Sequence, residues 1–275
     1  MLNAPSMIKI LSVAVYVTSL YLSLYVFCVG PALADDGSRD PLQQTSLVES
    51  ILQQSAVSKV PGARITSISS HFLGAPYLAN SLIGGPAEAE RLVTRLDGFD
   101  CFTFLDTVEA LRRSTDAAEF PVQMMQVRYR DGMVAYENRR HFFSDWVSGQ
   151  GALVTDVTAI VGQGRERHVR KRLNAKQAGV LWLDGVDVVP RTIAYIPASE
   201  LDAKLLDALE PGDYVGVFSP LAGLDVSHTG LIVEADGTIM LRHASSRGGV
   251  ERIIDEDLMT YLRGTTGLIV YRVMQ

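Results

Sequence analysis

One cysteine and two histidines are the residues of this chain whose types and spacing could do chemistry. Cys101 follows a turn that contains Gly98 and begins a strongly apolar helical pattern. At a helix start, unsatisfied N–H groups and the helix dipole favour the thiolate over the thiol. His228 and His243 each lie at the end of a predicted strand, 15 residues apart (243 − 228 = 15), on either side of a turn at 236–237. We expect antiparallel pairing to bring the two rings side by side.

This combination favours nucleophilic catalysis over a structural thiol. A thiol nucleophile needs a base within hydrogen-bond reach, and the base needs an orienting partner. Two imidazoles at one end of a hairpin can supply both. A lone cysteine could instead be buried filler or an intermolecular link. We interpret the remaining histidines as structural; they are His71, His141 and His168.

The N-terminus has the features of an export signal. An uncharged apolar stretch at 10–30 follows Lys9, and Ala32-Leu33-Ala34 provides a small-x-small cleavage site. We predict that residues 1–34 are a signal peptide and that the protein is exported to the periplasm. Removing them removes Cys28 and leaves Cys101 as the remaining cysteine. An uncleaved N-terminal anchor facing the periplasm is the alternative, because the stretch is long enough to span a bilayer.

Composition limits the function classes and the domain organisation. The formal charge is −6 and becomes −7 without the signal peptide, which carries one basic residue and no acid. An acidic chain has no electrostatic footprint for nucleic acid, and we expect no stable membrane partner after cleavage. We predict a mobile leader at 35–45 and a single domain at 46–275 with an inserted segment at about 115–190.

The elements that must position these residues are predicted from hydrophobic periodicity. Helical spacing marks 46–58, 63–72 and 101–114, whereas alternation at 125, 127 and 129 before the Asp131-Gly132 turn predicts a strand and hairpin. The basic cluster at 165–172 is interpreted as a solvated edge. Further strands are predicted at 192–196, 214–218, 229–234, 238–242 and 267–273, with helices at 199–209 and 255–262. Helices first and an antiparallel sheet afterwards indicate an α+β fold.

The motifs around the three residues resemble a known family. Asp100-Cys101, His228-Thr229-Gly230-Leu231-Ile232 and His243-Ala244-Ser245 resemble the NlpC-type cell-wall cysteine hydrolases. The resemblance implies a papain-like fold, with N-terminal helices packed on a central antiparallel sheet and a catalytic cysteine at a helix start. It also implies that Cys101 is the nucleophile, His228 the base and His243 the orienter. Tyr77, in Leu73-Gly74-Ala75-Pro76-Tyr77, resembles the family tyrosine that helps to form the oxyanion region.

Two departures from the common pattern resemble one branch of that superfamily. Asp100-Cys101-Phe102-Thr103-Phe104 and the segment from Arg139 to Trp146 are similar to motifs of the N-acetylmuramoyl-L-alanine-amidase-like branch. The implied reaction is hydrolysis of the amide between N-acetylmuramic acid and L-alanine, in peptidoglycan or muropeptide fragments. We expect no cofactor and no metal site, because the histidine spacing offers no ligand set.

The same segment suggests substrate contacts. Arg139 could pair with a carboxylate, Ser144 and Asp145 could bond hydroxyl or amide groups, and Trp146 could support the loop from beneath. We also assign Asp100 and Ser245, which adjoin the catalytic residues, to substrate binding. The alternative for Ser144-Asp145-Trp146 is a buried tryptophan with an aspartate cap.

Two other functions remain open on the sequence. A γ-D-glutamyl endopeptidase of the same superfamily would use the same three residues on a different bond. A non-catalytic cell-wall-binding module would hold Cys101 as an inert core residue, which should react slowly with alkylating agents.

Overall fold

A computed structural model describes residues 40–273 except 57, 59 and 178. The predicted signal peptide at 1–34, with Cys28, lies outside these residues, as does most of the predicted leader. Within the described ranges, no helix is long and apolar enough to cross a membrane.

Helix α1 (Pro41–Ser55) begins earlier than the sequence pattern predicted. The Asp40 side chain accepts a hydrogen bond from the N–H of Leu42 (3.0 Å), and Pro41 occupies the first turn. An aspartate cap followed by proline is a strong helix start, because it satisfies a free N–H and presets the backbone angle. Residues 41–45 are therefore helical, and the predicted leader is wrong for that part.

Helix α3 (Cys101–Arg113) is the central helix of the N-terminal half, and α2 (Pro61–Ser70) and α4 (Glu119–Arg128) pack against it. The last turn of α4, at 125–128, lies in the segment predicted as a strand. The buried residues Phe120, Met124 and Val127 have helical spacing, and this longer period overrides the local alternation at 125–129. The Asp131-Gly132 turn does form, with φ of 56° and 65°, but it follows a helix rather than joining two strands.

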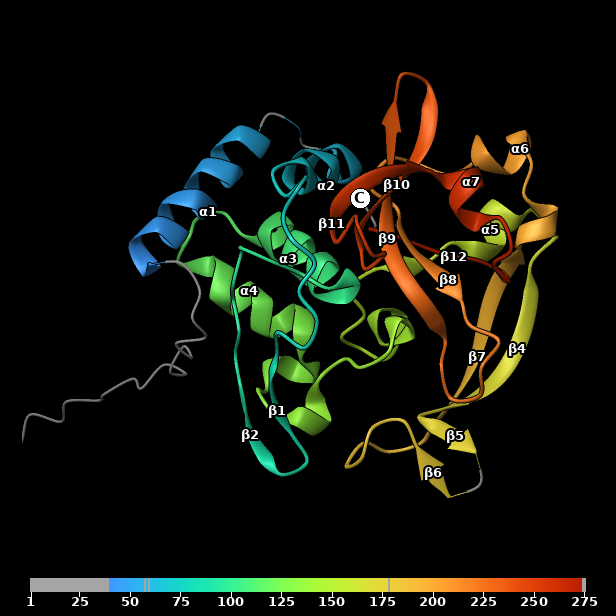
Figure 1. Cartoon of the computed structure of the whole chain (residues 1–275), viewed down its shortest axis with the longest axis horizontal. Coiled ribbons are helices and arrows are strands. Elements are labelled where there is room, and N and C mark those ends of the chain that lie inside the picture. The colour runs from blue at the N-terminus through green and yellow to red at the C-terminus, as the bar shows by residue number, and fades with distance from the viewer. Residues whose placement is uncertain (1–39, 57, 59, 178, 274–275) are drawn as a thin grey trace, which may run out of the picture. The chain divides into compact units, whose positions relative to one another are not determined.

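One antiparallel sheet of eight strands makes up the C-terminal half (Figure 1). The strand order is β11-β10-β9-β8-β12-β7-β4, with β3 beside β12. The strands are β3 (Thr155–Asp156), β4 (Arg167–Leu173), β7 (Val189–Pro197), β8 (Tyr214–Phe218), β9 (Val226–Ala235), β10 (Thr238–Ser245), β11 (Arg252–Asp257) and β12 (Gly267–Arg272). The predicted α+β class with a large antiparallel sheet is confirmed.

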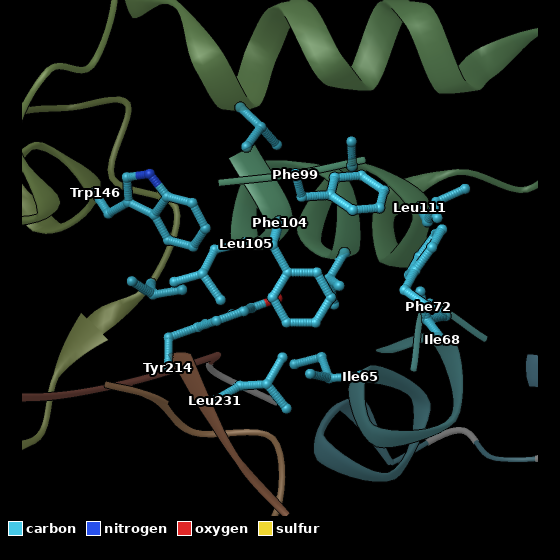
Figure 2. Close-up of a cluster of buried hydrophobic side chains, with 14 of the residues drawn as sticks. Ile65, Ile68, Phe72, Phe99, Phe104, Leu105, Leu111, Trp146, Tyr214 and Leu231 are labelled. Carbon is cyan, nitrogen blue, oxygen red and sulfur yellow. The ribbon is translucent and has the colours of Figure 1, made fainter. Parts of the chain in front are cut away.

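The sheet is buried on both faces. Leu231 and Tyr214 belong to the core cluster that includes residues of α1 to α4, several of which are drawn in Figure 2. Their neighbours in sequence, Ile232 and Val215, belong to a second cluster on the opposite face. The second cluster includes residues of α5 (Thr158–Gly162), α6 (Ala203–Leu206) and α7 (Leu258–Leu262). Alternation along β8 and β9 therefore supplies apolar side chains to two layers of helices.

The segment at 115–190 is joined to the main structure rather than set apart as an insertion. Helix α4 packs on α3, and β4 pairs with β7 along its full length at the end of the sheet. The basic cluster lies on this end strand, where Arg167, Arg170 and Arg172 are exposed, as expected for a solvated edge. Two small hairpins are separate from this sheet: β1 (Ile83–Gly85) with β2 (Glu88–Arg91), and β5 (Ala175–Gln177) with β6 (Val180–Leu181).

Two helices predicted in the C-terminal third are shorter than expected. Residues 198–200 form a 3₁₀ turn, and α6 then begins after Asp202, whose carboxylate accepts from the N–H of Leu205 (3.0 Å). Residues 255–257 belong to β11, and α7 begins after the Asp257 cap. In both places an aspartate cap defines the helix start.

Candidate active site

Cys101 is the first residue of α3, and Asp100 caps the helix. Oδ1 of Asp100 accepts hydrogen bonds from the N–H groups of Phe102 (2.9 Å) and Thr103 (2.7 Å). The Thr103 hydroxyl in turn accepts a hydrogen bond from the N–H of Asp100 (3.0 Å), so the two residues form a capping box. The sequence assigned Asp100 to substrate binding, but its carboxylate stabilises the start of the helix that carries the thiol.

The start of α3 is also attached to the sheet. The hydroxyl of Thr229, on β9, donates to the backbone carbonyl of Cys101 (2.9 Å). Further along α3, the buried Glu109 carboxylate accepts from the Tyr214 hydroxyl on β8 (3.0 Å). These two contacts fix the position of Cys101 relative to the strands that carry the histidines.

Cys101 and His228 line the same pocket, which has a volume of about 310 Å³. Its walls are largely apolar, and they come from α3, the 141–143 loop, the 182–183 loop and the start of β9. The lining residues are Cys101, Phe102, His141, Phe142, Phe143, Trp182, Leu183, Leu224, Asp225, Val226, Ser227, His228 and Thr229. Within the described residues, no hydrogen bond joins the Cys101 thiol to His228. Hydrogen bonds of catalytic groups often tighten only when substrate is bound.

The two histidines contact each other as the hairpin predicted. Nε2 of His228 lies 2.8 Å from Nδ1 of His243, and the rings cross at 85°. Gly230 makes this possible, because a Cβ there would lie 3.1 Å from the His243 Cβ and 2.8 Å from the Arg242 carbonyl oxygen. The absence of a side chain at Gly230 leaves room for the His243 ring beside His228.

A carboxylate lies behind His243. Nε2 of His243 is 2.8 Å from Oε2 of Glu256 on β11, and Oε1 of Glu256 pairs with Arg247. The sequence interpretation missed Glu256, because it lies in a segment predicted as a helix. In the observed strand it lies diagonally opposite His243, since Leu241 pairs with Glu256 and His243 pairs with Ile254.

The electrostatics of the pocket favour neutral groups. Burial lowers the pKa of His228 to about 3, and His243 acts in the same direction. Burial also lowers the pKa of His243, although Glu256 opposes this. Burial and the Asp100 carboxylate raise the pKa of Cys101, and hydrogen bonds from Thr229 offset only part of this increase. The expected thiolate at the helix start is therefore wrong for the free protein, because desolvation of the charge outweighs the helix start.

Cys101 affects the pKa of two tyrosines. Burial raises the pKa of Tyr77, with smaller contributions from Cys101 and Asp100, and the Tyr77 backbone bridges to Phe99, two residues before Cys101. Burial raises the pKa of Tyr261 to about 12, again with a contribution from Cys101. The Tyr261 ring centroid lies 4.9 Å from that of His243. Tyr77 was predicted from its motif, whereas Tyr261 carried no signal beyond a short apolar helical pattern.

Arg139 is held by an internal carboxylate. It forms a bidentate pair with Glu90 on β2, in which Nη2 lies 2.7 Å from Oε1, and Glu90 also accepts from the Tyr129 hydroxyl (2.7 Å). Both side chains of the pair are largely buried. The structure therefore uses Nε and Nη2 of Arg139 inside the fold, and binding of a substrate carboxylate by this residue stays a prediction.

The Ser144-Asp145-Trp146 segment is buried. Asp145 pairs with Arg191 (2.8 Å) and accepts from the N–H of Phe142, while the Ser144 hydroxyl accepts from Arg191 (3.1 Å). Trp146 is 0% exposed and packs among aromatic rings of the core. The predicted substrate-facing loop is wrong, and the alternative of a buried tryptophan with an aspartate cap describes what is observed.

Two further predictions on individual residues have different outcomes. Ser245 is 1% exposed at the end of β10, so its assignment to substrate binding is wrong. His141, interpreted as structural, lines the pocket, while its Nε2 lies 2.8 Å from the Tyr136 carbonyl oxygen. Among the described residues, no group of three or more His, Cys, Asp or Glu side chains could hold a metal ion.

Residues 67–268 match the protein family described as N-acetylmuramoyl-L-alanine amidase-like. The matched region covers more than half of the chain. Comparison with curated proteins gives no match.

Solved structures resemble the fold. An N-acetylmuramoyl-L-alanine amidase from Bacteroides uniformis aligns with a TM-score of 0.65 and 24% identity, over 78% of this chain and 99% of that one. A protein from Legionella pneumophila aligns with a TM-score of 0.72 and 22% identity, over 85% of this chain and 95% of that one. At these identities the similarity shows a shared fold.

Proposed function

Because the chain belongs to the N-acetylmuramoyl-L-alanine amidase-like family, we propose that it hydrolyses the amide between the lactyl carbonyl of N-acetylmuramic acid and L-alanine, using Cys101 as nucleophile. One observation supports this most directly. Cys101 begins a capped helix and shares a pocket with His228, which is hydrogen-bonded to a second histidine. A nucleophile, a base and an orienting group are the three parts that thiol catalysis needs.

The first half of the reaction forms a thioester. Both the thiol and the imidazole are neutral at rest, so His228 accepts the thiol proton as the sulfur attacks the lactyl carbonyl. The C–S bond forms and a tetrahedral oxyanion develops. His228 then gives its proton to the nitrogen of L-alanine, the C–N bond breaks, and the peptide leaves as a neutral amine.

The second half releases the acid. His228 accepts a proton from water as the water oxygen attacks the thioester carbonyl. The C–S bond breaks, the proton returns to the Cys101 sulfur, and the muramic acid carboxyl leaves. No co-reactant other than water is needed for the balance.

The oxyanion needs donors beside the sulfur. Asp100 occupies the N–H groups of Phe102 and Thr103, so the N–H of Cys101 itself is the helix-start donor next to the thiol. The Tyr77 hydroxyl is the second donor in this proposal, since Cys101 affects its pKa and the Tyr77 backbone bridges to Phe99. Each such donor contributes on the order of 3 kcal/mol to transition-state stabilisation.

The wider relationship and the location are part of the same proposal. A cysteine at a helix start beside an antiparallel sheet supports membership of the NlpC-type superfamily with its papain-like fold.

Export to the periplasm through a cleaved signal at 1–34 would bring the enzyme to peptidoglycan or its fragments. Sequencing the N-terminus of the protein recovered from the periplasm tests cleavage, and a start at residue 1 would indicate the anchored alternative.

Mass spectrometry of the products tests the reaction. A purified N-acetylmuramoyl tripeptide that begins with L-alanine is incubated with the enzyme and with Cys101→Ala as control. We expect free N-acetylmuramic acid and the intact tripeptide from the wild-type enzyme alone. Release of muramoyl-L-alanyl-D-glutamate and the free third residue would show the γ-D-glutamyl endopeptidase instead. No cleavage of any bond would support the binding module.

A further inference from the structure

Three adjacent strands present a continuous row of hydrogen-bonding side chains. His228 is on β9, His243 on β10 and Glu256 on β11, and both contacts in the row measure 2.8 Å. Arg247 pairs with the second oxygen of Glu256, which holds the carboxylate in place. The His243 side chain is 1% exposed, so bulk water does not compete for its two nitrogens.

The row fixes where the protons are. A carboxylate can only accept a hydrogen bond, so the nitrogen of His243 that faces Glu256 must carry a proton. Burial lowers the pKa of His243, so the ring is neutral and its other nitrogen, Nδ1, is an acceptor. Nε2 of His228 faces that acceptor and must therefore donate. Since His228 is also neutral, its Nδ1 carries no proton.

We propose that Glu256 is a positioning residue that sets the tautomers of both histidines and so leaves Nδ1 of His228 free to accept the Cys101 proton. The expected effect on kinetics rests on the proposed function, whereas the assignment of the two tautomers is independent of it. Without an acceptor at Glu256, His243 could donate through Nδ1 instead. His228 would then carry its proton on Nδ1, where it could not act as a base.

The carboxylate also has a role once the reaction begins. When His228 takes the thiol proton it becomes positively charged, and its Nε2–H remains bonded to His243. Glu256 lies at the far end of the row, and its negative charge stabilises the protonated form of His228 across the two rings. A methionine would fill most of the same space and lose both effects, whereas a glutamine would keep an acceptor for His243 and lose only the charge.

Histidine NMR tests the tautomers without requiring any activity. Uniformly ¹⁵N-histidine-labelled Cys101→Ala protein is compared with the same protein carrying Glu256→Met, with His228 and His243 assigned by substitution; Glu256→Gln, which keeps an acceptor, is the matched control. We expect Nε2 to be protonated and Nδ1 unprotonated in both rings, and we expect Glu256→Met, but not Glu256→Gln, to disturb this assignment in both. A protonated Nδ1 on His228 before the change, or unchanged tautomers after it, would overturn the proposal.

Kinetics test the consequence. Loss of the group that directly orients a catalytic histidine costs at most about 10⁴-fold in kcat, and a group one ring further away should cost less, on the order of 10- to 100-fold. We expect Glu256→Met to lower kcat by that amount with little change in KM, and Glu256→Gln, which keeps an acceptor, to retain more activity. The control is Glu234→Gln, an exposed glutamate on the same hairpin, which should behave as wild type. Wild-type kcat in folded Glu256→Met would contradict the inference.

The pH profile separates this role from simple destabilisation. The charged and titratable groups around the pair are Cys101, Arg247, Asp255, Glu256 and Tyr261. Glu256 raises the pKa of His243, so Glu256→Gln should shift the acidic limb of kcat/KM to lower pH even as kcat falls. An unshifted limb would contradict the inference. If wild-type enzyme cleaves another bond, the same comparison is made on that bond; if it cleaves none, the proposed function fails while NMR still decides the tautomers.

Discussion

Two polar regions of this protein drew attention in the sequence, and the structure treats them differently. The first region consists of Cys101 and the row formed by His228, His243 and Glu256. Cys101 and His228 line a pocket, and among the described residues no internal group hydrogen-bonds to Nδ1 of His228. The segment from Arg139 to Trp146 is equally rich in polar groups. There Arg139 pairs with Glu90, and Asp145 pairs with Arg191 and a backbone N–H.

The difference lies in whether the remaining hydrogen-bonding positions can reach a ligand: His228 lines the pocket, whereas the nitrogens of the other segment that are unpaired within the described part of the chain, Arg140 Nε and Trp146 Nε1, are buried. Donors and acceptors that are fully used inside the fold stabilise it, because an unpaired buried polar group is costly. A group that keeps one position directed into a pocket can act on a substrate. Residue type alone does not distinguish the two regions, but their hydrogen-bond partners do.

Replacement of the thiol should have the largest effect on the pocket region. We expect Cys101→Ala to reduce amide hydrolysis by at least about 10⁴-fold, because the covalent route is lost. Cys101 is partly buried and belongs to neither apolar cluster, so the unfolding midpoint should change little. Turnover of the muropeptide and urea unfolding measure the two quantities. Substantial turnover by the folded variant would exclude the thioester mechanism.

Replacing either histidine should reduce kcat less than replacing the thiol, and the two histidines should differ in the size of the loss. His228→Ala removes the base and should cost about 10²- to 10⁴-fold in kcat. His243→Ala removes the orienting group and should cost less, since the base remains. Steady-state kinetics of both variants on the same muropeptide give the ranking. Equal activity of His228→Ala and wild type would remove His228 from the mechanism.

Asp145→Ala should affect stability rather than catalysis. It leaves Arg191 without its carboxylate and the N–H of Phe142 without its acceptor. Breaking a buried pair in this way costs about 3 kcal/mol of unfolding free energy. Urea unfolding measures this cost, and alkylation of Cys101 in the folded variant should be unchanged.

The control for that substitution is Asp184→Ala, at an exposed aspartate in the loop before β7. It should leave stability within experimental error. Normal stability together with a raised KM in Asp145→Ala would return this segment to substrate binding and break the contrast between the two regions.

The pH dependence of stability should give the smallest effect. His228 has a pKa near 6.5 when unfolded and about 3 when folded, so the unfolded state binds more protons between these values. Stability should therefore fall as the pH decreases below about 6.5. His228→Asn should show a shallower loss between pH 7 and pH 5, measured by thermal unfolding. His168→Asn, at an exposed histidine, is the control, and an unchanged slope in His228→Asn would show that His228 is not buried in its neutral form.

Much of the fold followed from local patterns. The strands at 214–218 and 229–242, the helix that begins at Cys101, and the α+β order are all set by periodicity, turn residues and caps, which act within a few residues of one another. The segments that differed were ones where two local signals competed. At 119–128 the helical spacing of buried residues overrode a short alternation, and at 255–257 pairing with β10 overrode a helical pattern.

The sequence by itself determined which residues could form the reactive set. A cysteine at a helix start and two histidines across a hairpin turn are placed by local geometry, and Gly230 between them leaves room for the rings. Only the tertiary structure decided the rest. Partners from distant segments occupy Arg139 and Asp145, a third strand adds Glu256, and burial keeps the thiol and both imidazoles neutral. Each of these depends on desolvation or on contacts between segments far apart in the chain, which no local pattern encodes.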